Sequence, residues 1–99
     1  MEIKKNENTI EVFGTIKTIE DAESIIETIK SVHDDVINIK IYDSYVIPSS
    51  IIGVLLKAID NGKKVMLGIK SDLLEELIKD LNLDKVFNLY RIWKKILYF

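Results

Sequence analysis

One stretch, residues 36–56, limits the possible folds more than any other, because it changes from a strand pattern to a helix pattern within a few residues. Residues 36–41 are mostly β-branched, and the polar side chains of Asn38 and Lys40 alternate with isoleucines, as in a half-buried strand. Pro48, the only proline of the chain, favours extended backbone at the residue before it and is well tolerated where a helix begins. An apolar run follows, so the sequence predicts a strand, a short turn and a buried helix.

Strand and helix patterns alternate along the rest of the chain, which is typical of an α/β fold. Thr18 and Ser71 each precede an apolar stripe with helical spacing, and both residue types are common helix N-caps. We predict one domain over residues 1–99, with a mixed β-sheet of about four to five strands and helices packed on it, in the order β-β-α-β-α-β-α-(β)-α. The predicted strands are residues 2–5, 9–13, 36–41, 63–69 and 86–90, and the predicted helices are residues 18–32, 49–60, a segment beginning after Ser71, and 91–99.

The predicted helices differ in how much apolar surface they carry. The helix after Pro48 is apolar around nearly its whole circumference, so it is either buried on several sides or keeps an apolar face for a partner. The first and third helices each have one stripe that we expect to pack on the sheet. These stripes are Ile19, Ala22, Ile25, Ile26 and Ile29 in the first helix, and Leu73, Leu74, Leu77, Ile78 and Leu81 in the third.

The composition excludes several classes of function. The net charge of −2 gives no reason to expect nucleic acid, and the absence of cysteine removes disulfides, thiol nucleophiles and thiolate metal sites. No apolar run approaches the roughly 20 residues of a membrane span, and residues 1–6 lack the apolar core of a signal peptide. His33, the only histidine, has no second ligand at a useful spacing. We therefore expect a cytoplasmic protein that is not an enzyme, needs no cofactor or metal, and does not insert into a membrane.

At this level the chain resembles the STAS domain, the fold of bacterial anti-sigma-factor antagonists and of sulfate-transporter C-terminal domains. The resemblance rests on a hairpin that ends in Gly14, the strand–serine pair–helix stretch, and a "Leu-x-x-hydrophobic-hydrophobic-x-hydrophobic-Tyr" ending at residues 83–90. The family signature Asp-Ser-Ser-Gly-Leu-Gly corresponds here to Pro48-Ser49-Ser50-Ile51-Ile52-Gly53. Two acidic positions of the family are Lys40 and Pro48 in this chain, and the first glycine of the signature is Ile51.

The resemblance implies a regulatory protein that works by binding. Ser49 matches the serine that family members have phosphorylated by a partner kinase, and Ser50 is the second candidate. The implied partner is an anti-sigma factor, a serine kinase of the histidine-kinase-like ATPase type. The alternative is the small STAS subunit of a lipid ABC transport complex, which docks on the transporter ATPase without phosphorylation. Pro48 in place of the acidic residue fits this alternative slightly better.

The predicted partner-binding surface surrounds the serine pair. For Ser49 and Ser50 the other interpretation is that they only cap the helix, since serine is a common N-cap. The apolar residues before them could be exposed for a partner or packed on the sheet edge. The aromatic segment from Phe87 to Phe99 could serve as a partner helix or a membrane-surface helix, or it could pack on the domain or in a homodimer. The predicted partner-binding residues are Tyr45, Val46, Ile47, Pro48, Ser49, Ser50 and Ile52.

Overall fold

A computed structural model describes residues 1–92 of the 99-residue chain. Its elements follow the order β-β-α-β-α-β-α-β, which confirms the predicted α/β class and the predicted order up to the last strand. The strands are β1 (Glu2–Asn6), β2 (Thr9–Phe13), β3 (Val36–Ile41), β4 (Lys64–Ile69) and β5 (Tyr90–Arg91). The helices are α1 (Ile19–Lys30), α2 (Ser49–Asp60) and α3 (Asp72–Asp80).

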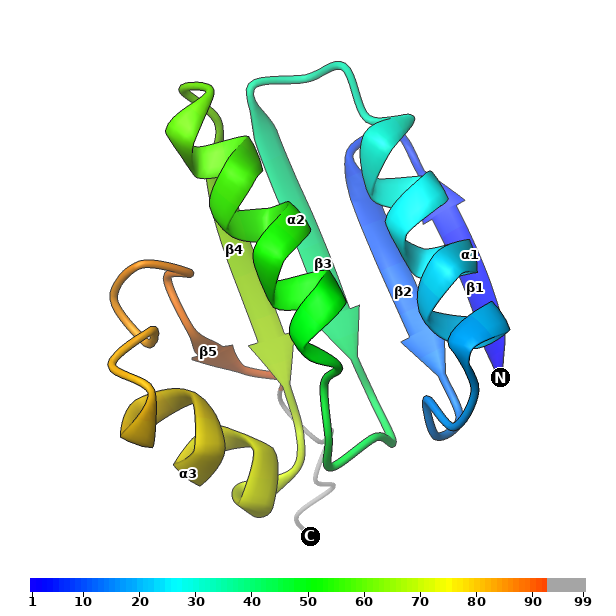
Figure 1. Ribbon diagram of the computed structural model, residues 1–99, viewed down its shortest axis with the longest axis vertical. Helices are drawn as coiled ribbons and strands as arrows, with labels where there is room; N and C mark the ends of the chain where they lie inside the picture. The colour runs from blue at the N-terminus through cyan, green and yellow to red at the C-terminus, as the bar shows by residue number, and fades with distance from the viewer. Residues whose placement is uncertain (93–99) are drawn as a thin grey trace, which may run out of the picture.

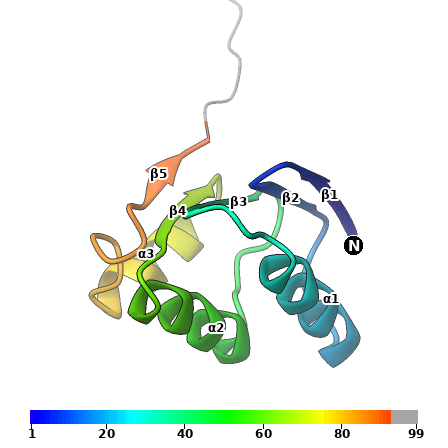
Figure 2. The same cartoon turned by 90° about the horizontal axis from the view of Figure 1, so that it is seen from above.

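The strands form one mixed sheet whose spatial order follows the chain, β1-β2-β3-β4-β5. β1 and β2 pair antiparallel as the predicted hairpin, and every later pair is parallel. Each parallel pair is connected through one helix, and α1 and α2 lie side by side across one face of the sheet (Figures 1 and 2). Within residues 1–92 no helix covers the opposite face (Figure 2). The carboxyl ends of β2, β3 and β4 therefore lie at the same end of the sheet as the starts of the helices.

The core lies between the sheet and the helices and is built mainly from isoleucine and leucine. Every second residue of β3 is buried, while Asn38 and Lys40 between them are only half-buried, as the predicted alternation requires. The buried residues of β3, α1 and α2 are Ile37, Ile39, Ile41, Ala22, Ile25, Ile29, Ile51 and Leu55.

Two of the predicted apolar stripes are partly wrong. Ile19 is the first residue of α1 and is 75% exposed, whereas Ala22, Ile25 and Ile29 in the later turns are buried. In α3 only Leu74 and Ile78 are buried. The residues that precede these two by one position point about 100° away around the helix and are therefore exposed. The exposed members of the predicted stripe are Leu73, Leu77 and Leu81.

Helices α1 and α3 begin at the caps predicted from the sequence. Thr18 Oγ1 accepts the N–H of Asp21 at 3.0 Å, and the Asp21 carboxylate accepts the N–H of Thr18 in return, which completes a capping box. The N–H of Lys17 also donates to Asp21, and this bond, with that from Thr18, lowers the pKa of Asp21 below its usual value. Ser71 Oγ accepts the N–H of Leu74 at 3.2 Å. Both helix starts are therefore fixed by local hydrogen bonds.

The predicted strand at residues 86–90 is wrong in its placement, because this segment is mostly turn. Asn88 has a φ of 47°, a left-handed conformation that interrupts any extended run. Strand β5 begins only at Tyr90 and pairs with the end of β4. Arg91, predicted to start a terminal helix, belongs to β5, and residues 93–99 of that predicted helix lie outside the described part of the chain.

Tyr42, which follows β3 on the uncovered face, gives the fold a pH dependence that can be tested. Its ring stacks on Phe13 with 4.6 Å between centroids, and its hydroxyl donates to Glu11 Oε2 at 2.5 Å. The hydrogen bond to the Glu11 carboxylate, together with partial burial, raises the pKa of Tyr42 from 10.0 to about 12. A raised folded-state pKa stabilises the protein below the unfolded-state pKa, and this contribution disappears as the pH rises through the folded-state value.

We therefore expect Tyr42→Phe to lower the free energy of unfolding at pH 8. The deficit relative to the wild type should shrink between pH 10 and pH 12, because the unfolded wild type then gains stability by releasing the tyrosine proton. Urea unfolding of both proteins across this pH range measures the deficit. A deficit that stays constant up to pH 12 would contradict the role assigned to the hydrogen bond with Glu11.

Candidate functional site

The predicted site lies at the edge of the sheet where β3 ends and α2 begins. Residues 42–48 connect these elements and run along the carboxyl ends of the parallel strands (Figure 1). Loops at this end of the sheet are carried by a rigid scaffold while their own side chains stay accessible, which is the usual arrangement of binding residues. The site is therefore a loop followed by the first turn of α2.

Two side chains that the sequence analysis did not select hold this loop in place. Ser44 is 1% exposed, and its Oγ donates to Val46 O at 2.8 Å while it accepts the N–H groups of Ile16 and Val46. Asp43 Oδ2 accepts the N–H of Gly14 at 2.6 Å, so the ends of β2 and β3 are linked. Aspartate and serine after a strand are turn formers that bond to nearby backbone, and this signal could have identified both residues.

Replacing Ser44 by alanine is expected to lower the free energy of unfolding by about 1–3 kcal/mol, because buried backbone N–H groups lose their acceptor. Thermal unfolding followed by circular dichroism measures this cost. Asp43→Ala is the matched comparison, since its exposed carboxylate makes a single bond across the same two loops. A Ser44→Ala protein as stable as the wild type would contradict the anchoring role of Ser44.

The three apolar residues before Pro48 divide into an exposed pair and a buried one. Tyr45 and Val46 are 54% and 40% exposed, which favours the interpretation that they are accessible over the one that packs them on the sheet edge. Ile47 is only 6% exposed, so its assignment to the partner-binding surface is wrong. The hydrogen bonds of Ser44 turn Tyr45 and Val46 outward, and the extended backbone before Pro48 then returns Ile47 to the core. Pro48 itself is half-buried.

Ser49 and Ser50 are the first two residues of α2, and both are exposed. Neither is the N-cap, so the interpretation that they only cap the helix is wrong. Pro48 occupies that position with extended backbone, and its carbonyl accepts the N–H groups of Ile51 and Ile52. In the described structure no side chain caps α2, and its first turn contains no acidic residue. The positive end of the helix dipole is therefore uncompensated beside the two hydroxyl groups.

The remaining residue of the predicted surface, Ile52, is half-buried and packs against the core. Ile51 beside it is completely buried, which fixes α2 on the sheet directly after the serine pair. The accessible part of the site therefore consists of Tyr45, Val46, Ser49 and Ser50, with partial exposure of Pro48 and Ile52.

The accessible part of this arrangement is a surface at the start of α2. It presents two apolar side chains and two hydroxyl groups at the positive end of a helix, and no acid–base pair is part of it. His33 is exposed in the connection between α1 and β3, and among residues 1–92 no three His, Cys, Asp or Glu side chains lie together as a metal site would require. None of the helices described is both long and apolar enough to span a membrane.

No protein-family model, curated protein or solved structure matches the chain. The resemblance to STAS domains therefore remains a prediction from the motif and the order of elements. The function has to be inferred from the site itself.

Proposed function

We propose that this protein is a non-catalytic binding module that contacts a partner protein through Tyr45, Val46 and the first turn of α2, and that phosphorylation of Ser49 releases the partner. The observation that carries this proposal is the exposed Ser49 hydroxyl at the uncapped start of α2, next to two exposed apolar side chains. By its resemblance to anti-sigma-factor antagonists, the partner would be a serine kinase of the histidine-kinase-like ATPase type.

A phosphoryl group at Ser49 is compatible with the fold. It adds about −1.5 to −2 charge at pH 7, and the free N–H groups and dipole at a helix N-terminus stabilise such a group. Since α2 has neither a capping side chain within the described residues nor an acidic residue in its first turn, nothing there competes with a phosphate. The phosphate would instead weaken partner binding, because a partner in contact with Tyr45 and Val46 would have to remove water from the charged group.

The second candidate function is a subunit that docks on the ATPase of a lipid ABC transport complex without phosphorylation. Pro48 favours this alternative, because it replaces the acidic residue that the phosphorylated family members have before the serine. The same surface would serve both functions, so the two differ in the identity of the partner and in the chemistry at Ser49.

Photocross-linking tests the placement of the site and identifies the partner. A photoreactive amino acid at Tyr45 is expected to cross-link a partner in host lysate, while the same group at Lys5, an exposed residue of β1, should not. A cross-linked kinase that adds one phosphoryl group to the wild type but none to Ser49→Ala would support the switch. A cross-linked transporter ATPase that leaves the mass of the wild-type protein unchanged would support the alternative. Cross-links from Lys5 and none from Tyr45 would contradict the site.

A further inference from the structure

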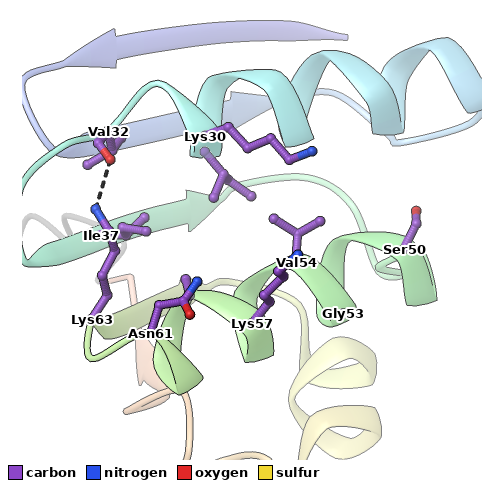
Figure 3. A pocket seen from close by; sticks show the side chains of 11 residues that line it. Lys30, Val32, Ile37, Ser50, Gly53, Val54, Lys57, Asn61 and Lys63 are labelled. Atoms are coloured by element: carbon purple, nitrogen blue, oxygen red, sulfur yellow. Dashed lines mark hydrogen bonds between the residues drawn. The ribbon is translucent and has the colours of Figure 1, made fainter.

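A furrow lies between α1 and α2 and reaches Ile37 of β3 at its base. It consists of two hollows of about 450 and 500 Å³, and Ser50 lines both of them. Ala22 and Ile26 of α1 line one hollow, and Val54 and Ala58 of α2 line the other. Each helix has 12 residues and is therefore about 18 Å long, which limits the length of the furrow between them. Figure 3 shows the hollow toward the carboxyl ends of the helices.

Gly53 keeps this hollow open. It is exposed in the middle of α2, and no heavy atom of the described residues lies within 4 Å of the position that a Cβ would occupy. A glycine inside a helix costs about 0.5–1 kcal/mol relative to alanine, and the backbone of Gly53 has no positive φ that would require glycine. Neither helix stability nor local packing accounts for Gly53, whereas access to the furrow does.

The same hollow has a basic rim. Lys30 of α1 and Lys57 of α2 line it together with Lys63, and none of the described lining residues is acidic (Figure 3). Lys63 Nζ is held by the carbonyl groups of Val32 and Asp34, at 2.9 and 2.8 Å. Lys30 and Lys57 form no ion pair with any residue of the range 1–92. The furrow thus combines an apolar floor with two ammonium groups that are available to a carboxylate.

The shape of the furrow favours a helix over a small molecule. Ligand pockets usually enclose most of their ligand, whereas both hollows of this furrow are partly open to solvent. An amphipathic helix can place one row of apolar side chains in such a groove and cover it with its own backbone. The unpaired lysines require acidic residues beside that row.

We infer that the furrow binds one amphipathic helix of a partner protein, with an apolar side chain over Gly53 and a carboxylate near Lys30 and Lys57. This inference rests on the proposed function as a protein-binding module and specifies the chemistry of the partner. It also extends the contact surface from Ser50 along the whole of α2.

A displayed library of helical peptides tests this inference on the complete chain. The library keeps an apolar stripe fixed at helical spacing and varies the polar positions among Glu, Lys and Gln. Selection on the wild type, with removal of binders to Gly53→Leu, is expected to enrich Glu over Lys. The affinity of enriched peptides, measured by calorimetry, should fall at least about tenfold for Gly53→Leu, because the new side chain fills the hollow.

Charge reversal supplies the second part of the test. Lys57→Glu should lower the affinity for the enriched peptides about fivefold or more. Lys5→Glu, the same change on β1, should leave that affinity unchanged. Because Lys57 also lies in the last turn of α2, thermal unfolding of each variant separates lost binding from lost stability. Gly53→Leu is expected to be at least as stable as the wild type, since leucine is the better helix former.

Failure to enrich any peptide, enrichment of Lys over Glu, or equal binding to Gly53→Leu would overturn the furrow as the binding site. These results are separable from a failure of the proposed function. A partner cross-linked at Tyr45 without furrow binding would overturn only this inference. Furrow binding that Ser49→Asp leaves unchanged would support this inference, because Ser49 does not line either hollow.

Discussion

Replacing Phe87 by alanine is expected to lower the free energy of unfolding by about 3–5 kcal/mol, the usual cost of deleting a buried aromatic side chain. Phe87 is completely buried and is the largest side chain buried to this extent in the described structure. It belongs to the core cluster that also contains Leu74 and Ile78 of α3. Its backbone carbonyl accepts the N–H of Leu67 at 2.9 Å, so the turn that carries the ring is hydrogen-bonded to β4.

Urea unfolding followed by far-ultraviolet circular dichroism measures this loss. Val86→Ala is the matched control, because Val86 is the exposed neighbour in the same turn and its truncation should change the free energy of unfolding by less than about 0.5 kcal/mol. Similar values for the two variants would contradict the packing of Phe87. A domain of this size has only about 5–15 kcal/mol of total stability, so Phe87→Ala could remove a large part of it.

Phe87 also explains why the end of the chain was harder to predict than the middle. Residues 36–41 combine β-branched residues with a two-residue period, and Pro48 marks the start of the next helix, so local chemistry determines both elements. Residues 86–90 show a similar apolar pattern, but Asn88 turns the chain and the segment contributes a single anchor to the core. A pattern of five residues cannot distinguish a strand from a turn with one buried side chain.

The site shows the same limit. Tyr45, Val46 and Ile47 follow one another in the same loop, and the apolar character of Val46 and Ile47 does not indicate that only Ile47 is buried. The difference arises from Ser44, whose hydrogen bonds to Ile16 and Val46 depend on the loop after β2. The apolar run after Pro48 predicts that a helix starts at the serine pair, whereas the N-cap is Pro48, whose extended backbone fills that position without a side-chain hydrogen bond.

The placement of Ser49 leads to the prediction that separates the two proposed functions. If phosphorylation is the switch, Ser49→Asp is expected to lower the affinity for the partner that cross-links at Tyr45 by at least about thirtyfold. A charge that the partner must desolvate without a counterion costs about 2 kcal/mol or more, and each 1.4 kcal/mol is a factor of ten in affinity. Ser49→Asn is the matched control, since it has nearly the same shape and no charge, and it should bind like the wild type.

The stability of the variants shows whether lost binding is a direct effect. An aspartate in the first turn of α2 would interact favourably with the uncompensated positive end of the helix dipole. The free energy of unfolding of Ser49→Asp should therefore be about 0.3–1 kcal/mol higher than that of Ser49→Asn at low salt. A variant that is more stable than its control and yet releases the partner has lost affinity through charge alone. Equal binding of a transporter ATPase to both variants would instead favour the docking function, because such an interface lacks the sensitivity to negative charge at Ser49 that a phosphate switch requires.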